Sequence, residues 1–60
     1  MEGLIRLNKV KEMTTLSTST IYRLLDKGEF PLRVSLGLRK VFWVEQEIKD
    51  YLAKRLARRF

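Results

Sequence analysis

The fold is decided by residues 15–28, which read TLSTSTIYRLLDKG. Ser17 is a strong helix N-cap, because its hydroxyl can accept a hydrogen bond from a free backbone N–H of the first turn. Three apolar residues then stand at the i, i+3 and i+4 spacing that places them on one helical face: Ile21, Leu24 and Leu25. Gly28 tolerates the positive φ at which many helices end. The stretch therefore predicts a helix over residues 18–27, preceded by a turn over residues 15–17.

A second and shorter helix is expected before that turn. It covers residues 8–14, with Asn8 as its cap and with Val10 and Met13 spaced to share a face. Residues 4–7 are a brief extended lead-in. Two short helices that are joined by a turn of three residues form a helix-turn-helix.

After the longer of these helices, the chain changes to the pattern of a β-hairpin. Pro31 forbids continuation of the helix. Three apolar residues then alternate with polar ones, as in a strand with one exposed face: Leu32, Val34 and Leu36. Gly37 and Leu38 predict a two-residue turn, after which residues 40–43 return as a second strand. We call the hairpin over residues 31–43 the wing.

A third helix is expected over residues 45–58, beginning at Val44 or Glu45. Its acidic residues lie towards its N-terminus and its basic residues towards its C-terminus, as the helix dipole favours. Its buried face is expected to hold four residues: Ile48, Tyr51, Leu52 and Leu56. Residues 1–60 therefore form one domain that is mainly α-helical with a small β-hairpin. The fold class is a winged helix-turn-helix with three helices and a two-stranded wing.

The charge balance indicates a polyanionic partner. Among 60 residues, 13 Lys and Arg face seven Asp and Glu, which gives a formal net charge of +6. Each phosphate that a basic side chain neutralises releases condensed counterions, so a small basic domain suits a nucleic acid. The chain has no cysteine and no histidine, which excludes a zinc finger, a disulfide framework, a thiol nucleophile and a histidine base. We therefore expect no enzyme, no cofactor and no metal ion.

The sequence has no pattern typical of secretion or of a membrane span. The first residues include Glu2 and Arg6 and few apolar side chains, unlike a signal peptide. No apolar run approaches the roughly 20 residues that a bilayer requires. Residues 52–60 are amphipathic and basic, which also suits a helix at a membrane surface. Because one face of that helix is needed for the core, we expect no membrane partner and a cytoplasmic location.

The outer faces of the second helix and of the wing carry the residues that we expect to contact duplex DNA. A major groove about 12 Å wide admits one α-helix, whose N-terminal residues then reach the base edges. Short hydroxyl side chains permit close approach, and Arg23 can contact guanine with two hydrogen bonds. No acidic residue lies between Pro31 and Val44, which favours phosphate contacts by the wing. The candidate DNA-binding residues are Ser17, Thr18, Ser19, Thr20, Tyr22, Arg23, Lys27, Arg33, Ser35, Arg39 and Lys40.

These residues also have purely structural explanations. Ser17 stabilises the helix by about 1 kcal/mol as a cap, whichever function holds. Tyr22 can instead pack over the wing, because its ring is apolar and only its tip is polar. The cations of the wing can serve solubility alone. Trp43 is expected in the core, between the hairpin and the helices.

Several stretches together resemble the AlpA family of small phage and prophage regulators. The similar stretches are residues 16–24 (LSTSTIYRL), 28–31 (GEFP) and 34–37 (VSLG), followed by Arg39 and Trp43. The family is related to excisionases and to the DNA-binding domains of MerR-type proteins. The resemblance implies transcriptional control of integrase or excision functions on a bacterial or phage mobile element. It also implies a location in the bacterial nucleoid and an integrase as a partner.

The resemblance runs from about Leu7 to Leu56, with two departures in the wing. Leu38 stands where such sequences have a second small residue, and Phe42 stands where they have a small residue before the Trp. One recognition helix reads only a few base pairs, so useful specificity calls for several copies on adjacent sites. We therefore expect self-association or cooperative binding.

Two other classes of function stay open at this point. A small RNA-binding accessory protein would share the basic charge, although the strands lack a paired aromatic platform on which bases stack. A protein-interaction adaptor is favoured only if Leu38, Phe42 and Phe60 are exposed together. The leading hypothesis is sequence-specific binding of double-stranded DNA by a transcription regulator, an excisionase-type factor, or both.

Overall fold

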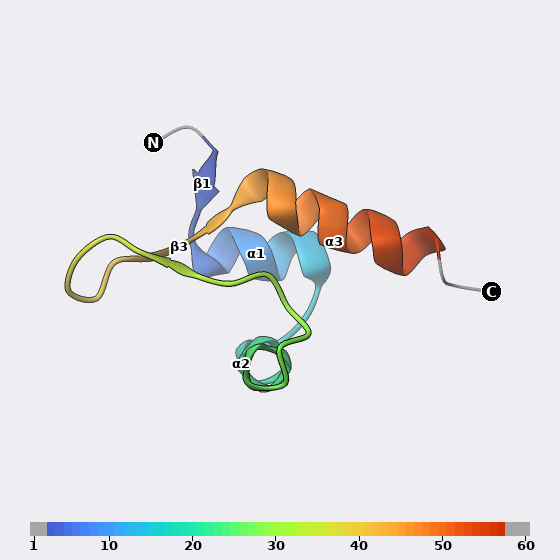
Figure 1. Ribbon diagram of the computed structural model, residues 1–60, viewed down its shortest axis with the longest axis horizontal. Helices are drawn as coiled ribbons and strands as arrows, with labels where there is room; N and C mark the ends of the chain where they lie inside the picture. Colours follow the sequence, from blue (N-terminus) through green and yellow to red (C-terminus); the bar gives the residue numbers. More distant parts are fainter. Residues whose placement is uncertain (1–2, 58–60) are drawn as a thin grey trace.

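The computed structural model describes residues 3–57. Its helices and strands follow in the order β1 (Leu4–Ile5), α1 (Leu7–Thr14), α2 (Thr18–Asp26), β2 (Val34–Ser35), β3 (Val41–Val44) and α3 (Glu45–Ala57). Figure 1 shows the hairpin of β2 and β3 extending away from the helices. This arrangement is the winged helix-turn-helix that the sequence predicts.

The turn between α1 and α2 comprises residues 15–17, as predicted. Thr15 has a left-handed backbone with φ of 59°, and its N–H donates a hydrogen bond to the Lys11 carbonyl at 2.7 Å. Ser17 is the N-cap of α2, because its Oγ accepts a hydrogen bond from the Thr20 N–H at 3.2 Å. The turn and the cap are both confirmed.

The start of α1 differs from the prediction. The helix begins at Leu7 with Arg6 at the N-cap position and no side chain that caps it, so the prediction of an Asn8 cap is wrong. β1 ends at Ile5, and the Arg6 carbonyl accepts the first helical hydrogen bond from the Val10 N–H at 3.1 Å. Strand pairing immediately before the helix therefore sets its first residue.

The end of α2 has the geometry of a Schellman motif. The helix stops at Asp26, one residue before the predicted end, and Gly28 has φ of 71°. The Gly28 N–H donates to the Leu25 carbonyl at 3.0 Å, and the Glu29 N–H donates to the Leu24 carbonyl at 2.9 Å. The predicted role of Gly28 is confirmed, since a left-handed residue is needed to close both bonds.

β3 is the central strand of a three-stranded antiparallel sheet in the order β1-β3-β2. The paired residues are Leu4 with Val44, Ile5 with Trp43, Val34 with Phe42, and Ser35 with Val41. The wing has two strands, as predicted. The lead-in over residues 4–7 adds β1 to the other edge of β3, which fixes the N-terminal segment to the start of α3.

The loop at the tip of the wing is longer than predicted. The Leu36 N–H donates to the Lys40 carbonyl at 2.9 Å, which leaves three residues in the loop and not Gly37-Leu38 alone. Arg39 is the third loop residue, with φ of 66°, and Gly37 has φ of 114°. The prediction of a two-residue turn is wrong because an arginine occupies a left-handed conformation that is uncommon outside glycine.

The first strand of the wing is shorter than its apolar pattern suggests, and the second is shifted by one residue. β2 has two residues, and β3 begins at Val41, one residue later than predicted. Leu32 is 72% exposed and Leu36 is 40% exposed, so only Val34 of the three alternating apolar residues is half-buried. The outer part of the hairpin extends beyond the helices, so its apolar side chains have no core to pack against (Figure 1).

The core lies where the helices meet β3. It consists of five buried apolar side chains, one each from α1, α2, the segment after α2, β3 and α3: Val10, Ile21, Phe30, Trp43 and Ile48. α3 begins at Glu45 as predicted, whereas residue 58, its predicted end, lies outside the described residues. Leu56 is 59% exposed, so the predicted buried face of α3 ends at Leu52.

Trp43 contacts the segment that links α2 to the wing. Its Nε1–H donates to the Pro31 carbonyl at 3.1 Å, which confirms its predicted place in the core and satisfies its polar atom. The ring of Phe30 lies edge-on to Trp43 at 6.5 Å between centroids and edge-on to Tyr51 at 4.9 Å. Phe30, in the segment that joins α2 to the wing, thus packs between an aromatic residue of β3 and one of α3.

Trp43→Ala is expected to unfold the domain nearly completely. Removal of a buried aromatic side chain costs about 3–5 kcal/mol, and a 60-residue chain has a total stability of roughly 3–9 kcal/mol. Leu32→Ala is the control, because an exposed position changes stability by less than about 0.5 kcal/mol. Urea unfolding followed by circular dichroism measures both. Equal midpoints for the two variants would place the indole outside the core.

Candidate nucleic-acid interface

The first turn of α2 presents hydroxyl groups at the surface of the molecule. Ser17 and Ser19 are exposed, and Thr18 and Thr20 are half-buried. The Ser17 Oγ donates to the Thr20 Oγ1 at 3.0 Å in addition to its capping bond, so both its donor and its acceptor are engaged. Within the described part of the chain, the Ser19 hydroxyl has no hydrogen-bond partner. Ser19 is therefore the hydroxyl that is best placed to meet a ligand.

The rest of the outer face of α2 is joined to the base of the wing. Arg23 and Lys27 are exposed, and Tyr22 is half-buried. The Cζ of Arg33, which precedes β2, lies 5.2 Å from the centroid of the Tyr22 ring. This distance is typical of a cation–π interaction. Tyr22 thus contacts the wing segment, and one cation is held beside the helix.

The remaining candidates lie on the outer part of the wing. Ser35, Arg39 and Lys40 are exposed, and the Ser35 Oγ donates to the Gly37 carbonyl at 3.4 Å. Figure 1 shows that this part of the hairpin extends away from α2. The candidates therefore form two groups. The helix group is Ser17, Thr18, Ser19, Thr20, Tyr22, Arg23, Lys27 and Arg33, and the tip group is Ser35, Arg39 and Lys40.

The cations of both groups are free of ion pairs within residues 3–57. The one salt bridge in this range joins Lys9 and Glu12 on α1, with 3.4 Å between Nζ and Oε1. Arginine and lysine side chains without a carboxylate partner are available to phosphate oxygens. The two groups consequently form a basic surface without internal neutralisation.

Arg6 is an exposed cation that our candidate set omitted. Its Cζ lies 4.9 Å from the centroid of the Phe42 ring on β3, and Phe42 is half-buried. This contact depends on the pairing of β1 with β3, for which the sequence has no clear signal. The contact also disfavours the protein-interaction adaptor, which required Leu38 and Phe42 to be exposed together. Leu38 is 95% exposed, but Phe42 is half-buried. Phe60 lies outside the described residues.

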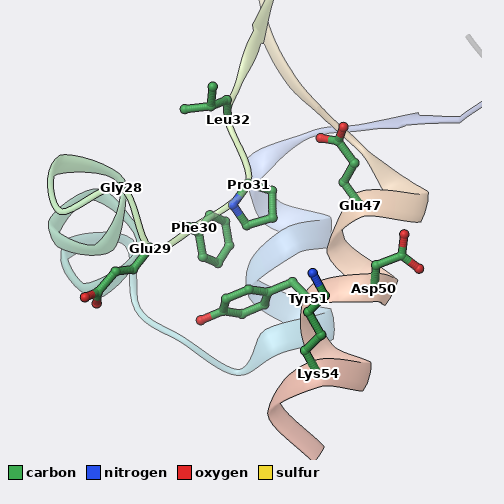
Figure 2. A pocket seen from close by; sticks show the side chains of 9 residues that line it. All are labelled: Gly28, Glu29, Phe30, Pro31, Leu32, Glu47, Asp50, Tyr51 and Lys54. Carbon is green, nitrogen blue, oxygen red and sulfur yellow. The ribbon is translucent and has the colours of Figure 1, made fainter.

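A shallow hollow of about 580 Å³ lies between α3 and the segment that follows α2. Figure 2 shows Glu29 on one side of it, Glu47 and Asp50 on the other, and Pro31 and Tyr51 between them. Carboxylates at its edge disfavour a polyanion, so the hollow is separate from the basic surface. Among the described residues, no three side chains form a group that could hold a metal ion. None of the described helices has the length and apolar character of a membrane span.

A capped helix-turn-helix, followed by a basic hairpin that packs through Trp43, defines a winged helix-turn-helix domain. The chain belongs to the AlpA family, because the family described as "Prophage CP4-57 regulatory protein (AlpA)" matches residues 3–56. It is also 45% identical over 58 residues to "Uncharacterized protein ORF88" of Enterobacteria phage P4. That similarity covers 97% of this chain and 66% of the phage protein, so the chain spans just under two thirds of this relative. The resemblance that the sequence shows is confirmed.

The contact between Tyr22 and Arg33 is expected to couple α2 to the wing energetically. A double-mutant cycle of Tyr22→Leu and Arg33→Gln on urea unfolding should give a coupling of about 0.5–1 kcal/mol, as for exposed cation–π pairs. Lys40→Gln replaces Arg33→Gln in the control cycle, since Lys40 lies on the outer wing. The control coupling should stay below about 0.3 kcal/mol. Similar values in both cycles would mean that the effect is one of general charge.

Proposed function

We propose that this chain binds double-stranded DNA in a sequence-specific way and regulates transcription on a phage or other mobile element. The observation that carries the proposal is the contact of Arg33 with Tyr22, which joins the outer face of α2 to a wing without acidic residues. A recognition helix and a phosphate-binding hairpin that are held as one unit can act on a duplex together. Membership of a family of prophage regulators supports the same function.

In this proposal α2 enters the major groove. Ser19 and the neighbouring threonines approach the duplex closely because their side chains are short, and the free N–H groups of the first turn favour a phosphate. Arg23 is exposed on the same helix and reads guanine through two hydrogen bonds. Tyr22 keeps its ring against Arg33 and offers its hydroxyl to the DNA.

The cations of the wing contact the phosphate backbone. Arg33, Arg39 and Lys40 are exposed, and no salt bridge engages them within the described residues. Phosphate contacts fix the position and orientation of a protein on DNA without reading its sequence. The wing therefore determines where α2 lies along the groove, and α2 makes the hydrogen bonds that read the bases.

The proposal extends to assembly and to the role on the mobile element. A single α2 reads only a few base pairs, so several copies on adjacent sites are needed for useful specificity. An excisionase-type role, with an integrase as partner, fits a small basic protein of a prophage family. Such a regulator would act in the bacterial nucleoid and without catalysis of its own, and the chain has no histidine or cysteine for acid–base or thiol chemistry.

RNA binding is the second candidate, and the structure contains one feature that disfavours it. The aromatic residues are engaged elsewhere: Trp43 is buried, and Phe42 is half-buried beside Arg6. No pair of exposed rings within residues 3–57 offers a platform on which bases could stack. Comparison of the protein's affinity for duplex DNA with its affinity for single-stranded RNA of the same base composition separates these two candidates.

Duplex binding is expected to depend strongly on salt. If about four to six phosphates are contacted, the logarithm of the association constant should fall against the logarithm of salt concentration with a slope near −4 to −5. Fluorescence anisotropy with labelled duplex at several salt concentrations measures the slope. A slope near zero would exclude the phosphate contacts, and tighter binding to single-stranded RNA would favour the second candidate.

Arg23→Ala and Lys40→Ala are expected to differ in their effect on specificity. Arg23→Ala should cost about 1–3 kcal/mol on the specific site and less on random duplex, because it removes a base contact. Lys40→Ala should weaken both by similar amounts, since a phosphate contact is the same on any sequence. The specific site comes from a footprint on the DNA that flanks the gene of this protein. Equal losses on both duplexes for Arg23→Ala would reassign that residue to the backbone.

A further inference from the structure

The tip of the wing holds an apolar side chain in nearly full contact with water. Leu38 is 95% exposed, compared with 72% for Leu32, 59% for Leu56 and 40% for Leu36. A single exposed leucine is common on protein surfaces, so its exposure alone indicates no function. The backbone conformation of the loop, its charge and its place in the fold indicate that Leu38 contacts a binding partner.

The backbone of the loop holds Leu38 between two left-handed residues. Gly37 has φ of 114° and Arg39 has φ of 66°, and the bond from the Leu36 N–H to the Lys40 carbonyl closes the loop. A left-handed backbone is unfavourable for a residue with a Cβ, so glycine would be more stable than arginine at position 39. The loop thus keeps a cation beside Leu38 at a cost in stability. Local strain of this kind is typical of a site that acts on a partner.

The charged groups around Leu38 in the sequence are all cations. Arg39 and Lys40 follow it directly, and no Asp or Glu occurs between Pro31 and Val44. A lipid surface would require an amphipathic face with several apolar side chains. A single apolar side chain next to two cations fits a narrow groove that has phosphates along its walls and the edges of stacked base pairs at its floor. The minor groove of DNA has this chemistry.

We propose that Leu38 is a wedge that enters the minor groove and inserts between two adjacent base pairs, so that the duplex bends. This inference rests on the proposed function. Figure 1 shows that the wing extends away from α2. With α2 in the major groove, we expect the tip of the wing to reach the neighbouring minor groove. Apolar wedges partly unstack one base step and bend the duplex towards the major groove.

The cations next to Leu38 and the sequence of the DNA both favour insertion. Arg39 and Lys40 bind phosphates beside the inserted Leu38, which offsets the loss of base stacking. Pyrimidine–purine steps such as TA and CA unstack most easily, so they are the expected points of insertion. A bend there brings more of the protein surface onto the duplex. The wing then contributes to specificity through the deformability of the DNA, without a hydrogen bond to a base.

Energy transfer between dyes at the two ends of a short duplex measures the bend. The duplex contains the footprinted site with a TA step at the expected position of the tip. The wild type and the control Leu32→Ala should bend it equally. Leu38→Ala should lose at least half of the bend and bind about tenfold more weakly, because it lacks the wedge. Leu38→Phe should keep the bend. 2-Aminopurine beside the TA step should brighten with the wild type and not with Leu38→Ala.

The outcomes separate the wedge from the proposed function. Binding without a bend, or an equal bend with Leu38→Ala, overturns the wedge and leaves DNA binding by α2 intact. Failure of the wild type to bind any duplex overturns the proposed function, and the wedge with it. Because Leu38 is 95% exposed, thermal melts of its variants should coincide with that of the wild type. Retention of the bend by Leu38→Phe ties the effect to an apolar side chain at this position.

Discussion

The burial of Trp43 is the constraint on which the rest of the structure depends. Its strand is the central one of the sheet, between β1 and β2, and the indole shares the core with buried side chains from all three helices. Its Nε1–H binds the Pro31 carbonyl at 3.1 Å, and Phe30 packs edge-on against its ring. These contacts fix the segment between α2 and the wing. The placement of Arg33 beside Tyr22 follows from them, because the link has only a few residues in which to vary.

Features that depend on neighbours in the sequence could be predicted, and features that depend on strand pairing could not. The Ser17 cap, the left-handed Gly28 and the start of α3 each arise within one helical turn. The Asn8 cap failed because β1 pairs with β3 and sets the first residue of α1. The exposure of Leu36 could not be predicted for a related reason, since the alternation of apolar and polar residues does not reveal that the hairpin extends beyond the core.

In the candidate site, too, features set by neighbours in the sequence could be predicted and contacts between distant segments could not. Exposure of the polar face of α2 could be predicted, because Ile21 and its neighbours on the apolar stripe fix which face is buried. The contact of Arg33 with Tyr22 joins residues eleven apart across a proline and a change of structure, which no periodicity encodes. Arg6 against Phe42 is a similar case. Contacts of the site with a ligand are a matter of chemistry outside the chain and stay predictions.

The composition of the core has a consequence for the lifetime of the protein in a cell. Its five buried residues come from α1, α2, the segment after α2, β3 and α3, so none of these five segments can open without exposing the others. Small domains of this kind unfold in a single cooperative step. Proteases attack the open form, and the rate of attack follows its equilibrium population when opening and closing are fast. The abundance of this protein in a cell then depends on its free energy of unfolding, and any ligand that binds only the folded chain slows its degradation.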